Sequence, residues 1–311
     1  MRFRGLVIFI CLMLTMGAGL FAWQGRKAPR ASLTIATWNL QWLVDGPTAR
    51  AARIACRQAQ HSVLPCDVAR ELSRDSADLA RLASYVRKLD ADVIAFQEVE
   101  NAHIARRVFR GYRICINTGP GLQQVGFAFK PGLAKDCGQP LATLTAGGRG
   151  RAGRVLVIHQ RGFDPVTLLT VHLKSGCARD PFDATSEACE LLAAQSHALG
   201  QWITARAASN TPFIVLGDFN RGGLPQVDDP FWGPLDPTTF TAAAESLRYT
   251  NCSWGAPYRE FIDHILVSRS LRSRLATPSF GQQTYRARDA ARYLLSDHCP
   301  IKVYLNSVID L

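Results

Sequence analysis

Carboxylates, carboxamides and histidines stand in or directly after short apolar runs along this sequence. Such side chains normally avoid the ends of buried strands unless something there needs ligands. A hydrated Mg²⁺ or Ca²⁺ with a bound phosphate needs this combination of oxygen donors and imidazoles. The pattern therefore predicts a site for metal-assisted phosphoester chemistry. Its candidate residues are Asn39, Glu98, His172, Asp218, Asn220, Asp263, Asp297 and His298.

Each of these residues also has an ordinary structural interpretation when it is taken singly. Asn39 and Asn220 are typical of residues that cap turns. Glu98 fits a solvated strand end, and His172 fits a satisfied histidine of the core. The prediction of a site therefore rests on the collection and not on any one member.

The elements that must position these residues are mostly strands. Helical spacing of apolar residues follows the capping candidates Asp75 and Ser76, and a second helix is predicted from Ser186 to about Arg206. Many strands with few, unevenly placed helices indicate an α+β sandwich. The predicted strands are 33–38, 92–96, 112–116, 125–129, 154–159, 168–173, 213–216, 262–267 and 300–305.

Six segments, in this order, resemble motifs of the endonuclease/exonuclease/phosphatase superfamily: TWNLQWL, VIAFQEVE, TVHLKS, VLGDFN, IDHILVS and SDHCPI. A single GDxN would be a weak signal, but six ordered motifs are specific. The resemblance implies a four-layer α/β/β/α sandwich of two packed mixed sheets flanked by helices. It also implies cleavage of phosphoester bonds with a divalent metal, Mg²⁺ first and Mn²⁺ or Ca²⁺ as alternatives.

The resemblance also assigns roles to the metal-binding and water-activating residues. Glu98 would be the main metal carboxylate, with Asn39 nearby and Asp297 as a further candidate ligand. Asp218 would orient or deprotonate the attacking water. Asn220 would hydrogen-bond the phosphate.

Two histidines complete the set implied by the resemblance. His298 would contact the scissile phosphate, oriented by Asp263, and His172 would be the second histidine facing the phosphate. His172 stands where AP endonucleases have Asn, which disfavours abasic-site repair. The deoxyribonuclease I branch pairs this histidine with a Glu, whereas residues 101–130 contain no acid. A carboxylate partner for His172 is therefore in doubt.

The N-terminal segment predicts export. Residues 5–23 form an unbroken apolar run after a short basic start, which is typical of a signal peptide or of a membrane anchor. We therefore expect residues 1–30 to be such a segment and residues 31–311 to form one catalytic domain. The body would be secreted or periplasmic, or held at the inner membrane by an uncleaved segment.

The cysteines also indicate a location outside the cytoplasm. Eight lie outside the apolar run, and an even number in an exported chain indicates disulfides. Sequence does not choose among the many connectivities; pairing of neighbours is the simplest expectation, because each pair would close a loop. No C-x-x-C occurs, which disfavours zinc. The expected pairs are Cys56 with Cys66, Cys115 with Cys137, Cys177 with Cys189 and Cys252 with Cys299.

The substrate is less constrained. Without residues 1–30 the chain has 31 basic and 25 acidic residues, a net charge near +6 that suits a polyanion or an ordinary surface. The first hypothesis is a nuclease that acts on DNA or RNA, with Trp42 and Tyr112 as candidates to stack on bases. A phosphodiesterase for phospholipid headgroups or inositol phosphates is the alternative, and a non-catalytic binding module is remote. Arginines near the motifs could follow a phosphate backbone: Arg149, Arg151, Arg154, Arg179 and Arg221.

Overall fold

The computed structural model describes residues 32–134, 137–178, 186–223, 229–243, 252 and 260–307. The predicted targeting segment at residues 1–30, and Arg179, lie outside the described residues. Ala31–Leu311 forms one compact unit. None of the helices described is long and apolar enough to cross a membrane.

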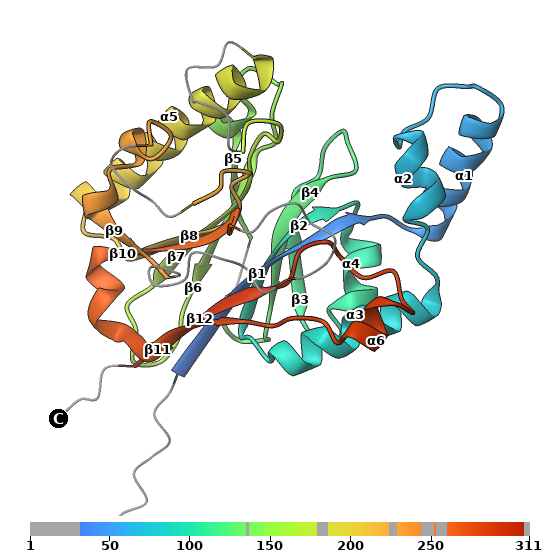
Figure 1. Cartoon of the computed structure of the whole chain (residues 1–311). Helices are drawn as coiled ribbons and strands as arrows, with labels where there is room; N and C mark the ends of the chain where they lie inside the picture. The colour runs from blue at the N-terminus through green and yellow to red at the C-terminus, as the bar shows by residue number, and fades with distance from the viewer. Residues whose placement is uncertain are drawn as a thin grey trace, which may run out of the picture. The chain divides into compact units, whose positions relative to one another are not determined.

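Two mixed sheets of six strands each form the centre of the fold (Figure 1). The order is β11-β12-β1-β2-β4-β3 in the first sheet and β5-β6-β7-β8-β10-β9 in the second. The first contains β1 (Ser32–Leu43), β2 (Val93–Val99), β3 (Arg113–Ile116), β4 (Gln124–Phe129), β11 (Leu275–Gln282) and β12 (Ile301–Asn306). The second contains β5 (Cys137–Leu141), β6 (Gly153–Ile158), β7 (Val166–His172), β8 (Phe213–Asp218), β9 (Phe240–Ala242) and β10 (Asp263–Ser268).

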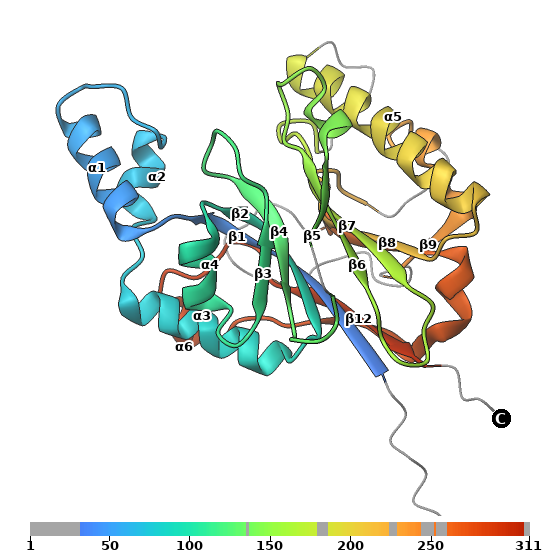
Figure 2. The same cartoon turned by 180° about the vertical axis from the view of Figure 1, so that it is seen from behind.

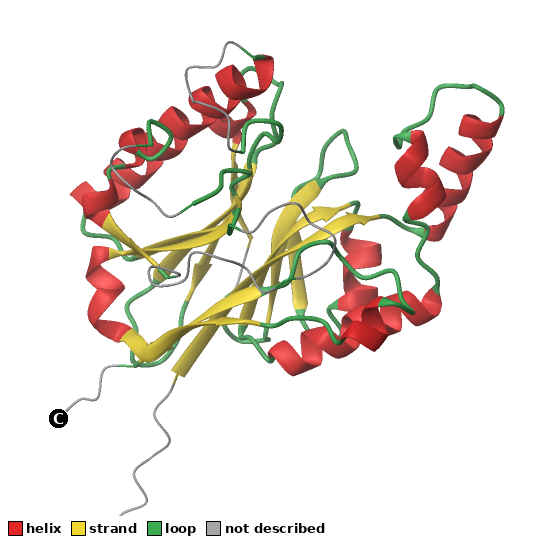
Figure 3. Ribbon diagram, viewed as in Figure 1, coloured by secondary structure: helices red, strands yellow, loops and turns green. Residues whose placement is uncertain are grey.

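Helices cover the outer face of each sheet, which confirms the predicted four-layer sandwich (Figures 2 and 3). α3 (Ser76–Leu89) and α4 (Ala102–Val108) pack on the first sheet, and α5 (Glu187–Ala208) packs on the second. A third apolar cluster, which includes Ile35 and Ile214, fills the space between the sheets. Because both faces of the central strands are buried, those strands appear in the sequence as continuous apolar runs.

Local signals located the two main helices correctly. Asp75 and Asp78 form a reciprocal capping box at the start of α3, and the Ser186 side chain accepts a hydrogen bond from the Cys189 N–H at the start of α5. Three strands were not predicted. β5 and β11 are edge strands that contain Gly and Pro, and β9 has only three residues, so none of them presents an apolar run.

The polar segment that follows β1 folds into two helices, α1 (Gly46–Arg57) and α2 (Cys66–Glu71). A small apolar cluster that includes Ala52 and Leu64 holds them together, and Trp42 and Leu122 pack against it. We call residues 45–74 the insertion. Its contact with Leu122 places it beside the β3–β4 hairpin (Figure 2).

The expected disulfide pairing is confirmed. Cys56–Cys66 closes the insertion, and Cys115–Cys137 joins β3 of the first sheet to β5 of the second. The other two close loops next to the predicted site. They are Cys177–Cys189, beyond His172, and Cys252–Cys299, beside His298.

Candidate active site

Strand register brings the predicted residues to one end of the two sheets. β1 and β2 run parallel with Asn39 opposite Gln97, and β7 and β8 run parallel with His172 opposite Asp218. β10 is antiparallel to β8 and places Asp263 opposite Asp218. The carboxyl ends of four strands and the amino end of a fifth therefore meet there. This convergence explains why polar residues follow apolar runs in the sequence.

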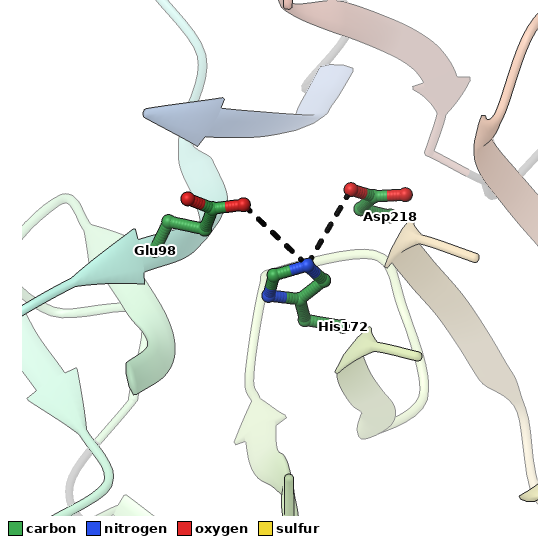
Figure 4. Close-up of side chains that lie close together, drawn as sticks. All are labelled: Glu98, His172 and Asp218. Atoms are coloured by element: carbon green, nitrogen blue, oxygen red, sulfur yellow. Dashed lines mark ion pairs between the residues drawn. The ribbon is translucent and has the colours of Figure 1, made fainter. Parts of the chain in front are cut away.

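Glu98, His172 and Asp218 form the centre of the site (Figure 4). His172 Nε2 lies 3.6 Å from Glu98 Oε1 and 3.6 Å from Asp218 Oδ2. Asn39 joins the two carboxylates, because its Nδ2 donates to Glu98 Oε1 at 3.1 Å and to Asp218 Oδ2 at 2.9 Å. Two carboxylates held this close repel each other unless a cation or a proton neutralises them.

The two asparagines are oriented by backbone groups. Asn39 Oδ1 accepts a hydrogen bond from the Gln41 N–H, which leaves its Nδ2 facing the carboxylates. Asn220 Nδ2 donates to the Leu173 carbonyl, while the Asn220 N–H donates to Asp218 Oδ1. Asn39 therefore acts here as a donor that positions two carboxylates. The roles predicted for both asparagines, metal binding and phosphate binding, stay predictions.

His298 lies on the other side of Asp218. Its Nδ1 is 2.7 Å from Asp263 Oδ2, and its Nε2 is 3.8 Å from Asp218 Oδ2. The His298 carbonyl accepts hydrogen bonds from Trp38 Nε1 and from the Tyr285 hydroxyl. His298 is thus held both at its imidazole ring and at its backbone carbonyl. This is the predicted pairing of His298 with Asp263.

The environment moves the two imidazole pKa values in opposite directions. Burial and the positive charge of Arg151 lower the pKa of His172 well below its usual value. Burial also acts to lower the pKa of His298, but the Asp263 and Asp218 carboxylates outweigh it and raise that pKa well above the usual value. His172 is therefore neutral and His298 cationic near neutral pH.

Burial also raises the pKa of Asp218, and the nearby Asp263 charge adds to this effect. The positive charge of His298 and hydrogen bonds from Asn39 and the Asn220 N–H act in the opposite direction. A carboxylate with a raised pKa is a better proton acceptor near neutral pH than an exposed one. The environment of Asp218 therefore suits a general base.

Arg151 is the main site residue whose partner the sequence did not reveal. Its Nη2 donates to His172 Nε2 at 2.8 Å and to the Leu173 carbonyl at 3.2 Å. Because a guanidinium only donates, Nε2 is the acceptor and His172 carries its proton on Nδ1. Among the described residues Nδ1 has no hydrogen-bond partner, which agrees with the lack of an acid in residues 101–130.

Four non-glycine residues at the site have a left-handed backbone conformation. Gln41, Trp42, Glu98 and Asn220 have φ values of 46°, 51°, 61° and 51°, a region that non-glycine residues seldom adopt. Hydrogen bonds hold one of these turns, since the Trp42 N–H donates to Glu98 Oε2 at 2.9 Å. Non-glycine residues elsewhere, such as Asp90 and Asp236, adopt the same conformation, so it is not confined to the site.

Arg74, at the end of the insertion, hydrogen-bonds both the end of β1 and the loop before His298. Its Nη1 donates to the Gln41 carbonyl at 2.8 Å, and its Nη2 donates to the Leu295 carbonyl at 2.7 Å. One carbonyl belongs to the end of β1, and the other precedes the segment with Asp297. The sequence did not predict this role, because an arginine in a polar segment gives no sign of its partners.

The arrangement fits a hard divalent cation. Glu98, His172 and Asp218 place one possible ligand atom each within 4.8 Å of one another; because His172 Nε2 accepts the hydrogen bond from Arg151, the Glu98 and Asp218 carboxylates are the ligands that this arrangement offers to a cation. A second group comprises Asp218, Asp263 and His298. Asp297 belongs to neither group, and its side chain is 48% exposed. Its role as a ligand stays a prediction.

Other predicted contacts lie elsewhere. Tyr112 packs against the helix-covered face of the first sheet and donates to the Ala91 carbonyl, so it is not placed to stack on a base at the site. Arg221 forms a bidentate ion pair with Asp229. Arg154 Nε contacts Cys115 Sγ. Of the described arginines singled out above, Arg151 alone contacts a site histidine.

Comparison with solved structures shows that the fold is shared. D. rerio TDP2 complexed with a single strand DNA product matches 89% of this chain and 99% of its own, with a TM-score of 0.59 and 19% identity. A 3′-5′ exonuclease from Neisseria meningitidis matches 87% and 98%, with a TM-score of 0.55 and 16% identity. An AP endonuclease from Archaeoglobus fulgidus matches 90% and 100%, with a TM-score of 0.53 and 14% identity.

No curated protein matches the chain. The model of the Endonuclease/Exonuclease/phosphatase family, however, matches residues 36–298 and so spans all the strand ends described above. Family enzymes use divalent metal ions, and the cluster around Glu98 offers suitable ligands. The chain belongs to the Endonuclease/Exonuclease/phosphatase family and is a metal-dependent phosphoester hydrolase.

Proposed function

We propose that this protein is an exported, Mg²⁺-dependent nuclease that hydrolyses phosphodiester bonds in DNA or RNA. One observation carries the proposal: Asp218 Oδ2 lies between two differently charged imidazoles, 3.6 Å from His172 Nε2 and 3.8 Å from His298 Nε2. In-line attack on a phosphodiester needs a base for the attacking water and donors for the phosphate oxygens. This group supplies both.

The proposed roles of the side chains follow from their protonation states. Asp218 accepts the proton of the attacking water, helped by its raised pKa. His298, kept cationic by Asp263, donates to a phosphate oxygen, and Arg151 adds a fixed positive charge on the opposite side. Glu98 would hold the metal, which when bound supplies Lewis-acid stabilisation of the phosphate charge.

Nucleic acid as the substrate is supported by two kinds of observation. Solved relatives of the same fold include a DNA complex and an exonuclease. The chain also has a net positive charge beyond residue 30. Export is supported by four disulfides, which persist in oxidising compartments. No specific contact among the described residues favours a lipid or inositol phosphate substrate.

The test uses the purified protein with Mg²⁺ on supercoiled plasmid, single-stranded RNA, sphingomyelin and an inositol phosphate. We expect nucleic acid cleavage that stops in EDTA and returns with Mg²⁺. Glu98→Ala should lose at least about 10² in turnover, because a carboxylate that holds the cation is removed. The matched control is Glu71→Ala, which removes an exposed carboxylate at the end of α2.

Hydrolysis of sphingomyelin or the inositol phosphate alone would overturn the nuclease assignment. Near wild-type turnover of Glu98→Ala would overturn the assignment of the site.

A further inference from the structure

A groove of about 520 Å³ lies beside the site and shares Arg151 with the chemistry proposed above. Its walls are the end of β1 with Trp42, the insertion with Val63, the β3–β4 hairpin with Leu122 and the segment before β6 with Arg151. Two of these walls, the insertion and the hairpin, also pack on each other through Leu122.

The groove is continuous with the active site through one side chain. Arg151 lines the groove, and its Nη2 contacts His172 Nε2 at 2.8 Å. The backbone of Trp42, on the neighbouring wall, donates to Glu98 Oε2 at 2.9 Å. A phosphate held between the histidines would therefore place the unit attached to it at the mouth of the groove.

The lining of the groove has the chemistry of a nucleoside site. It contains no acidic residue, and Arg151 gives it a positive charge. Val63 is 66% exposed and, with Trp42 and Leu122, offers apolar surface. Gln123 also lines the groove, and its side chain has no hydrogen-bond partner within the described part of the chain, so its amide is free to pair with the edge of a base.

We propose that this groove holds an unpaired nucleoside next to the scissile phosphate, and that the protein prefers single-stranded nucleic acid. The proposal rests on the proposed nuclease function. In a duplex each base is stacked and paired, so a base reaches a groove walled by loops only after it leaves the helix. A single strand offers its bases without that cost, and apolar and aromatic surfaces bind them with little sequence preference.

Two exposed apolar residues of the insertion provide a matched pair of variants. Val63→Glu places a negative charge at the groove, whereas Ile54→Glu places the same charge on α1, outside the lining. Gln123→Ala removes the free amide. For each full-length protein, kcat/KM is measured on a single-stranded oligonucleotide, on the same sequence as a duplex and on bis(p-nitrophenyl) phosphate.

We expect the wild type to prefer the single strand at least about tenfold. Val63→Glu and Gln123→Ala should each lower the ratio of kcat/KM for the single strand to that for the small diester by about threefold. For Val63→Glu the decrease should shrink at high salt. Ile54→Glu should keep the wild-type ratio.

Equal cleavage of single strand and duplex, or an unchanged ratio in both groove variants, would overturn the groove assignment while leaving the nuclease function standing. Cleavage of the small diester without cleavage of either oligonucleotide would overturn the nuclease function and the groove assignment together.

Discussion

The two histidines of the site occupy similar positions near strand ends but have opposite surroundings. His298 faces the carboxylates of Asp263 and Asp218, whereas His172 accepts a hydrogen bond from the guanidinium of Arg151. Neighbouring charge therefore raises the pKa of the partly buried His298 and adds to the effect of burial in lowering that of His172. The role of a histidine at this site is therefore set by its charged neighbours and not by its residue type or strand position.

The difference extends to how firmly each ring is held. His298 has an acceptor at Nδ1, and the disulfide Cys252–Cys299 adjoins it. His172 has a donor at Nε2 and, among the described residues, no partner at Nδ1. A cationic imidazole donates at both ring nitrogens, whereas a neutral one donates at one nitrogen. The two residues are therefore not interchangeable in phosphate chemistry.

The largest effect is expected for His298→Ala. Removal of the cationic donor should reduce turnover by at least about 10² without unfolding, because a positioned acid commonly contributes that much. The control is His197→Ala, on the exposed side of α5. Turnover is measured on the nucleic acid substrate, and folding by circular dichroism. A decrease no larger than that of His197→Ala would contradict the proposed difference in role between His298 and His172.

Asp263→Asn should have the next largest effect, about tenfold on turnover near neutral pH. The Asp263 carboxylate raises the pKa of His298, so its neutralisation lowers that pKa. Activity that needs cationic His298 is lost as pH rises through this pKa. The alkaline limb of the pH–rate profile should therefore move to lower pH in the variant. A limb that stays in place would show that His298 is not the group that titrates there.

His172→Gln should reduce turnover less, by about tenfold or under, because a neutral imidazole contributes a hydrogen bond and not a charge. Combining it with Arg151→Gln tests their contact. Since Arg151 Nη2 donates to His172 Nε2, the double variant should lose less than the product of the two single losses. Fully multiplicative losses would contradict a functional contact between the two side chains.

The smallest effect on turnover, about threefold, is expected for Arg74→Met. Its hydrogen bonds to the Gln41 and Leu295 carbonyls join the end of β1 to the loop before His298, so their loss should loosen the His298 side of the site. The free energy of unfolding should fall by about 1 to 2 kcal/mol, measured by urea denaturation. Arg70→Met, an exposed arginine of α2, is the control.

The fold class, the main helices and the residue types of the site could all be predicted from local sequence patterns. Apolar runs marked the central strands, and Asp75 and Ser186 marked the starts of two helices, because these signals act over a few residues. The disulfides joined nearest neighbours among the eight cysteines outside the apolar run, so the simplest pairing was correct. Six ordered motifs then identified the superfamily.

The partner of each polar side chain could not be predicted in this way, because it depends on how distant segments pack. Arg151 contacts His172, Arg74 spans two loops and Arg221 pairs with Asp229, although all three appear in the sequence as arginines in polar segments. Tyr112 lies away from the site because its ring joins the core under the helices. Such contacts depend on the directions in which loops return to the sheet, and these directions arise from packing across the whole domain and not from local pattern.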